Sequence, residues 1–142
     1  ADAAGAAEMK FGAGKGAKGL TIMTTLGTGI GSALFYNGVL IPNSELGHLE
    51  IGGIDAEKEA AFSAMEREEL SFQDWAKRLE RYYKTLERLF SPDLIIVGGG
   101  ISKSHQEFLP LINIDTEIVP AKTRNSAGII GAASIAYRSQ DN

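Results

Sequence analysis

Three short apolar segments joined by tight turns, between residues 20 and 41, constrain the fold more than any other part of the chain. Residues 20–26 (LTIMTTL) are rich in β-formers, and residues 32–36 and 39–41 are predicted as a second and a third strand. A glycine-rich turn joins the first two strands, and Asn37-Gly38 joins the second to the third. Both residues of an Asn-Gly pair tolerate the left-handed backbone of a two-residue hairpin. This region therefore predicts an antiparallel meander of three strands.

The rest of the chain alternates predicted helices and strands. Residues 71–90 carry apolar side chains at a 3.6-residue period, and Ser71 and Asp74 have the spacing of a helix N-terminal cap. Residues 94–97 (LIIV) are typical of a strand covered on both faces of a sheet. Shorter predictions are helices over residues 1–9, from Asp55, from Ser104 to Pro110 and from residue 125 or 126, and a strand over residues 114–119. The order predicts an α/β fold with a mixed sheet, in which parallel strands flanked by helices extend the meander.

Composition excludes several classes of function. The 142 residues suffice for one domain, 44% of them are hydrophobic, and none is cysteine. The lack of cysteine excludes a disulfide scaffold, a cysteine-ligated zinc site and a thiol nucleophile. The net charge of -4 argues against a nucleic-acid partner, and no apolar run reaches the roughly 18–20 residues that span a bilayer. We expect a cytoplasmic protein with no membrane partner.

The turn Gly27-Thr28-Gly29-Ile30-Gly31 is the first candidate site. Alternating glycines allow backbone N–H groups to converge on an anion, and the threonine hydroxyl adds a donor. The turn is not a Walker loop, because no Gly-Lys-Ser/Thr follows, and its glycine spacing differs from the dinucleotide fingerprint. A plain glycine-rich hairpin connection is the alternative.

The second candidate is Gly98-Gly99-Gly100, which follows the apolar strand. Glycines between a strand and a helix indicate a nucleotide crevice at the carboxyl end of a sheet. Lys103 stands where a dinucleotide fingerprint requires a small residue, which argues against a dinucleotide cofactor. A plain strand-to-helix turn is the alternative.

The third candidate is the loop that contains Glu45, His48 and Glu50, with Glu57 a little further along the chain. Carboxylates accept hydrogen bonds from vicinal hydroxyls and an imidazole can donate or accept one, so the group suits a polyhydroxylated ligand. A metal site is a competing hypothesis, but one histidine without cysteine is a weak zinc signature. A surface loop of satisfied polar groups is the other alternative.

Basic residues gather in or beside the glycine turns, whereas the acidic residues lie mainly on predicted helices. In a net-acidic protein this placement could form a local phosphate-binding patch, or the side chains could be ordinary solvated cations. The residues concerned are Lys10, Lys15, Lys18, Lys103, Lys122 and Arg124.

Together these motifs resemble the ROK family of sugar kinases and repressors. The resemblance lies in residues 26–32 (LGTGIGS), 45–48 (ELGH) and 97–102 (VGGGIS), and residues 41–51 and 119–133 resemble the members that phosphorylate glucose with polyphosphate. It covers nearly the whole chain and implies an actin-like ATPase fold of the ribonuclease-H type. Residues 1–142 would form the C-terminal lobe of a two-lobe kinase whose N-terminal lobe is absent from this chain.

The resemblance also implies roles for the motif residues. Glu45, His48 and Glu57 would bind sugar hydroxyls. The donor phosphates, accompanied by Mg²⁺, would lie against two glycine segments, made of Gly27, Thr28, Gly29 and Gly31 and of Gly98, Gly99 and Gly100.

Two departures from the family pattern matter. Most ROK proteins carry a cysteine cluster that binds zinc, and this chain has no cysteine, so no zinc is expected. The family's general-base aspartate precedes a helix that residues 1–5 (ADAAG) match, so Asp2 corresponds to a later residue and the base would stand immediately before Ala1. The 142-residue chain alone is therefore expected to be inactive.

The expected activity of the complete protein is phosphoryl transfer from polyphosphate or ATP to the 6-hydroxyl of glucose. A sugar-responsive transcriptional repressor of the same family, and a non-catalytic phosphate- or nucleotide-binding module, are the alternatives. The resemblance also suggests a homodimer, for which the apolar stripe of Trp75, Tyr82 and Tyr83 could supply an interface if it is not core.

Overall fold

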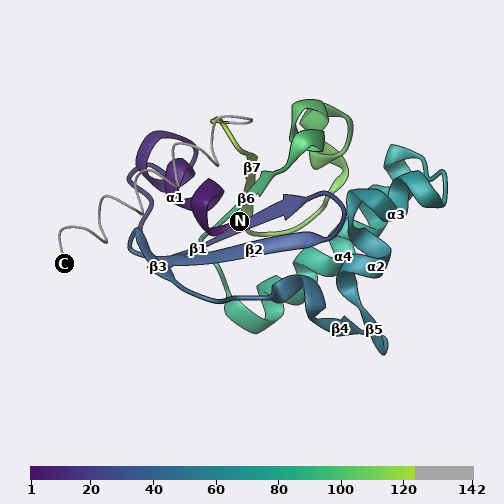
Figure 1. The fold of residues 1–142 in the computed structure, drawn as a ribbon, viewed down its shortest axis with the longest axis horizontal. Coiled ribbons are helices and arrows are strands. Elements are labelled where there is room, and N and C mark those ends of the chain that lie inside the picture. Colours follow the sequence, from purple (N-terminus) through teal and green to yellow (C-terminus); the bar gives the residue numbers. More distant parts are fainter. Residues whose placement is uncertain (124–142) are drawn as a thin grey trace.

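The computed structural model describes residues 1–123, and a five-stranded mixed sheet forms its centre (Figure 1). β1 (Leu20–Leu26), β2 (Ile30–Tyr36) and β3 (Val39–Ile41) form the predicted antiparallel meander. β6 (Leu94–Gly98) pairs in parallel with β1, and β7 (Glu117–Pro120) pairs in parallel with β6, which gives the order β3-β2-β1-β6-β7. The α/β prediction with a mixed sheet is confirmed.

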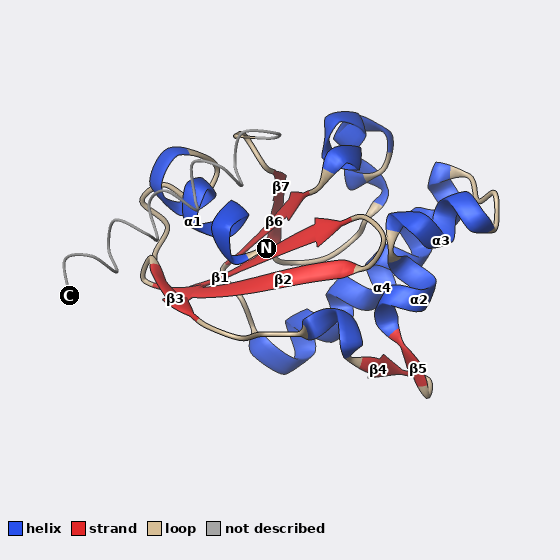
Figure 2. Ribbon diagram, in the orientation of Figure 1, coloured by secondary structure: helices blue, strands red, loops and turns tan. Residues whose placement is uncertain are grey.

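Helices cover both faces of this sheet (Figure 2). On one face, α1 (Asp2–Phe11) packs over a core that includes Met23, Phe35 and Ile96. On the other face lie α4 (Phe72–Phe90) and the short helices α2 (Ala56–Ala60) and α3 (Phe62–Arg67). Within residues 1–123, no helix has the length and apolar character needed to cross a membrane.

The long helix α4 follows the sequence prediction closely. The Ser71 hydroxyl accepts a hydrogen bond from the Asp74 N–H at 3.1 Å, which satisfies one of the free donors of the first turn. The predicted apolar stripe of Trp75, Tyr82 and Tyr83 is buried against the sheet. The stripe is therefore core and offers no surface for a dimer interface.

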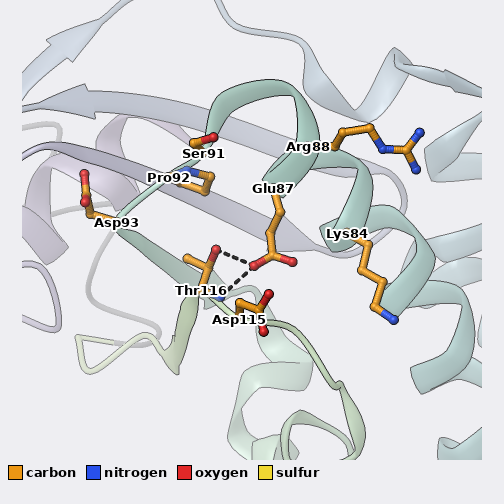
Figure 3. A pocket seen from close by; sticks show the side chains of 8 residues that line it. All are labelled: Lys84, Glu87, Arg88, Ser91, Pro92, Asp93, Asp115 and Thr116. Carbon is orange, nitrogen blue, oxygen red and sulfur yellow. Dashed lines mark hydrogen bonds between the residues drawn. The ribbon is translucent and has the colours of Figure 1, made fainter.

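A carboxylate attaches the last turns of α4 to the chain that leads into β7. Glu87 Oε2 accepts hydrogen bonds from both the N–H and the hydroxyl of Thr116, each at 2.6 Å (Figure 3). This contact lies at the end of the sheet where β6 and β7 begin, in an open hollow of about 760 Å³ that Lys84 and Arg88 also line.

Several shorter predictions were wrong or incomplete. The helix from Asp55 is two helices, and a hairpin of β4 (Glu50–Ile51) and β5 (Ile54–Asp55) precedes it. Asp55 takes the cap position, but its side chain does not cap the helix. Ser104 does not begin a helix: it lies inside a 3₁₀ segment, Gly100–Glu107, with a non-helical backbone. A second 3₁₀ turn, Leu109–Leu111, follows; the last strand begins at Glu117 rather than at 114, and the predicted final helix lies outside the described residues.

Candidate functional site

Two glycine turns lie side by side because β1 and β6 are adjacent parallel strands, with Thr25 level with Gly98. Gly99 has φ of 93°, and a Cβ atom on it would lie 2.3 Å from the carbonyl oxygen of Leu26. Only glycine allows the two turns to approach this closely. Between them is an open cleft of about 420 Å³, lined by Thr25, Leu26, Gly27, Thr28, Gly29, Ile30, Gly31, Glu57, Gly99 and Gly100.

The turn between β1 and β2 offers few free donors. The Gly27 N–H bonds to the Gly29 carbonyl at 3.0 Å, and the Ile30 N–H bonds to Glu57 Oε2 at 2.9 Å. The N–H groups of Thr28 and Gly29 make no hydrogen bond within residues 1–123, so they are the ones that could receive an anion.

Charge in this cleft does not support a basic phosphate-binding patch, which was one of the two interpretations of the basic residues. Among the described residues, Glu57 is the one charged side chain that lines it, and no lysine does. Arg124, the remaining member of the predicted patch, lies outside the described residues. An anionic ligand would therefore meet backbone dipoles and one carboxylate, and would need a cation of its own to balance the charge.

The loop that follows β3 is fastened to β2 directly after the glycine turn. The Ser32 hydroxyl lies 3.0 Å from the Ser44 hydroxyl and accepts a hydrogen bond from the Leu46 N–H at 2.9 Å. The Ser44 hydroxyl also donates to the Ser32 carbonyl at 3.0 Å. A 3₁₀ turn, Leu46–His48, follows, with Glu45 at its N-terminal boundary. These bonds fix the position of Glu45 relative to the glycine turn.

His48 lies among carboxylates. Its Nδ1 is 3.1 Å from Asp55 Oδ2 and 3.5 Å from Glu57 Oε1. The hydrogen bond with Asp55, followed by the charge of Glu57, raises the pKa of His48, and Glu45 adds to the effect. Because Nδ1 faces Asp55, the other ring nitrogen is left to meet a ligand.

A second hollow, of about 370 Å³, adjoins the cleft at Gly31, which lines both. Its other lining residues come from the first turn of α1 and from the loop after β3: Ala1, Asp2, Ala3, Ser32, Asn43, Ser44 and Glu45. The hollow is thus bounded by carboxylate, amide and hydroxyl side chains, a set that suits a ligand with several hydroxyl groups.

The structure separates the predicted site residues into two neighbouring groups. The glycine turns and Glu57 surround the cleft, and Glu45 lines the hollow next to it. Glu57 connects the groups, because one of its oxygens holds the glycine turn and the other faces His48. Gly98 and His48 are exceptions: Gly98 is buried inside β6, and neither residue lines the cleft or the hollow.

Sequence reasoning missed three contributors to this region. Asp55 was predicted as a helix cap, yet it is the hydrogen-bond partner of His48. Ser44 was not singled out, and Ser32 was noted only as the end of the glycine motif, although the two fasten the loop. The sequence does place the carboxylate of Asp55 seven residues after His48. Only the fold shows that the two side chains meet.

Comparison with known proteins finds homologues that are identical to this chain at about half of the aligned positions. Polyphosphate glucokinase of Mycobacterium tuberculosis (strain H37Rv) is 50% identical over 133 residues, which are 94% of this chain and 50% of that protein. The chain is a homologue of the polyphosphate glucokinases. The polyphosphate glucokinase of Mycobacterium leprae is 49% identical, with 41% of its length covered. No family model matches, and this polyphosphate glucokinase homologue spans about half the length of the relatives it matches or less.

Solved structures agree with this assignment. The inorganic polyphosphate/ATP-glucomannokinase from Arthrobacter sp. strain KM is 56% identical, with a TM-score of 0.94 over 97% of this chain and 55% of that one. A ROK-family glucokinase from Streptomyces griseus, solved with glucose and AMPPNP, is 21% identical with a TM-score of 0.81 over 97% of this chain and 66% of that one, which shows the fold alone. The predicted resemblance to ROK sugar kinases, with their actin-like ATPase fold, is confirmed.

Proposed function

We propose that this chain forms the C-terminal lobe of a glucose kinase that transfers a phosphoryl group from polyphosphate or ATP to the 6-hydroxyl of glucose. The observation that carries the proposal is the pair of adjoining hollows that share Gly31. One suits a phosphate chain and the other a polyol, which is the arrangement that phosphoryl transfer between them requires. The names of the similar enzymes support the donor and the acceptor.

On the acceptor side, Glu45 and His48 would orient the sugar, with Glu57 reaching His48 from the neighbouring glycine cleft. Carboxylates accept hydrogen bonds from sugar hydroxyls, and the free ring nitrogen of His48 donates when it is protonated. The raised pKa of His48 keeps that donor in place to a higher pH than an isolated histidine would. Both side chains have fixed positions from which to orient a sugar. The loop that carries Glu45 is hydrogen-bonded to Ser32, and the imidazole of His48 is hydrogen-bonded to Asp55.

On the donor side, the free N–H groups of Thr28 and Gly29 would hold terminal phosphates, with Gly99 and Gly100 forming the opposite wall. Gly27 and Gly31 shape the turn, and Gly98 ends the strand that carries the wall. Phosphoryl transfer depends mainly on positioning and on charge stabilisation, which backbone donors provide without reorganisation.

A magnesium ion fits this cleft as a companion of the donor. Within residues 1–123, no group of three or more acidic, histidine or cysteine side chains could cage a metal, and Glu57 alone lines the cleft with a carboxylate. Mg²⁺ is commonly held by substrate phosphates, water and one or two carboxylates, so Glu57 is the side chain that could contact it. When bound, the ion would neutralise charge on the donor phosphates.

The general base would be an aspartate immediately before Ala1, at the start of α1. The first residues of α1 line the acceptor hollow, so a carboxylate at that point would lie beside the reacting hydroxyl. The complete kinase is further proposed to be cytoplasmic and to form a homodimer. Sedimentation analysis tests the dimer.

The repressor and the inert-module hypotheses receive no specific support. A ROK-family transcriptional regulator shares the fold at 18% identity and a TM-score of 0.78, which does not bear on activity.

The experiment is a measurement of glucose 6-phosphate formation by the full-length protein, with polyphosphate and ATP supplied separately. Turnover with polyphosphate supports the whole proposal, and turnover with ATP alone keeps the kinase while removing the polymer donor. A folded protein that turns over neither donor contradicts the proposal. If the base stands before Ala1 as proposed, the isolated 142-residue chain is expected to show no turnover.

A further inference from the structure

Glu8 is a completely buried carboxylate on α1, away from the hollows described above. It accepts hydrogen bonds from four donors. Three are backbone N–H groups, of Ala13 at 3.0 Å, Lys122 at 2.7 Å and Thr123 at 2.9 Å, and the fourth is the hydroxyl of Thr123. One side chain therefore joins α1, the glycine-rich loop after it and the segment that leaves β7.

The chain is built closely around this carboxylate. A Cβ atom at Gly12 would lie 2.5 Å from Glu8 Oε1, so the loop is pressed against it. Burial acts to raise the pKa of Glu8, but the hydrogen bonds from Thr123, Lys122 and Ala13 outweigh it and the pKa is lowered. The Glu8 carboxylate is thus a buried anion whose oxygens are hydrogen-bonded to four donors.

The position of α1 matters because its first turn lines the hollow that Gly31 shares with the glycine cleft. From Glu8 to Asp2 is about 9 Å along the helix axis, which is fewer than two turns of one continuous helix. Movement at Glu8 therefore moves Ala1 and Asp2 relative to Gly31.

We propose that Glu8 is a positioning residue that sets where the first turn of α1 stands beside Gly31, and thereby places the catalytic end of the helix against the reacting hydroxyl. The inference rests on the proposed kinase function. It concerns the rate of transfer rather than sugar affinity, because Glu45 and His48 are held by a separate set of bonds, through Ser32 and Asp55, none of which involves Glu8.

The test is Glu8→Gln in the full-length protein, with kcat and the KM for glucose measured at a fixed interval below the unfolding temperature of each variant. Glutamine keeps the shape but turns an NH₂ group toward donors that need an acceptor. A displacement of about 1 Å can cost up to about a hundredfold in rate, so we expect kcat to fall at least about tenfold while KM changes less than about threefold.

The matched control is Glu87→Ala, which removes the carboxylate that fastens α4 to Thr116 at the opposite end of the sheet (Figure 3). It is expected to lower the unfolding temperature and leave kcat within about twofold, because no hollow of the site is near it. If both variants lose kcat in proportion to their stability, or if Glu8→Gln keeps the normal kcat, the positioning role is refuted.

Gly12→Ala provides the same test if Glu8→Gln does not fold, because it displaces the carboxylate without removing it. A reduced kcat at normal KM supports the proposal, and an unchanged kcat refutes it. A wild-type protein without glucose kinase activity would instead refute the proposed function, so the two failures are distinguishable.

Discussion

Gly47 is a position at which one added methyl group should disturb the site strongly. In the structure, a Cβ atom at Gly47 would stand 2.2 Å from the carbonyl oxygen of Ile30 and 2.9 Å from Glu57 Oε2. Ordinary contact begins near 3.4 Å, so Gly47→Ala has to push the turn away from β2 by about 1.2 Å. The obstacle is backbone, which cannot rotate aside as a side chain can.

The cost follows from this displacement. Overpacking of this kind destabilises a protein by about 1–3 kcal/mol. A shift of about 1 Å in the groups that orient a substrate can lower the rate about a hundredfold, and Glu45 and His48 flank the residue that moves. We expect kcat/KM for glucose to fall by about that factor, because both the rate of transfer and the binding of the sugar depend on these groups.

Urea denaturation and steady-state kinetics with varied glucose measure both effects. Gly38→Ala is the control: Gly38 has φ of 81° and nothing within 4 Å of an added Cβ, so it carries backbone strain of about 1–2 kcal/mol without a clash at the site. A Gly47→Ala protein with normal stability and a normal kcat/KM, or a Gly38→Ala protein with an equal loss of kcat/KM, would show that the packing argument is wrong.

Two further predictions concern other contacts. Asp55→Asn removes the largest contribution that raises the pKa of His48, so an NMR titration of the imidazole should show a lower pKa and a smaller protonated fraction at neutral pH; an unchanged titration contradicts the assigned pair. Thr24→Val leaves the buried Tyr83 hydroxyl without the partner it has at 2.8 Å, and should lower the free energy of unfolding by about 1–3 kcal/mol, which addition of Tyr83→Phe should largely restore.

Sequence reasoning succeeded where local chemistry decides structure. The meander follows from β-rich segments and the Asn37-Gly38 pair, whose φ values of 50° and 81° are those that the hairpin requires. The helix α4 follows from a long apolar period and a cap at Ser71. Both signals depend on residues close together in the chain.

Sequence reasoning failed where the role of a residue depends on partners that are distant in the chain. The strands β4 and β5 have two residues each, too few to show a period. A helical Glu8 is typical of a solvated face, yet its partners Lys122 and Thr123 lie 114 and 115 residues away. The need for glycine at 47 likewise comes from the backbone of Ile30, which no local pattern reveals.

The parallel pairing of β1 with β6 also determines when the cleft can exist. The meander is made of neighbouring segments, but Leu20 and Asp93, which are hydrogen-bonded at 2.9 Å beside this pairing, are 73 residues apart in sequence. Closing so long a loop is entropically costly, and contacts of this range slow folding. The two glycine turns face each other only after that step. A ligand that binds only between them therefore stabilises the long-range pairing by mass action, and its binding reports that folding is complete.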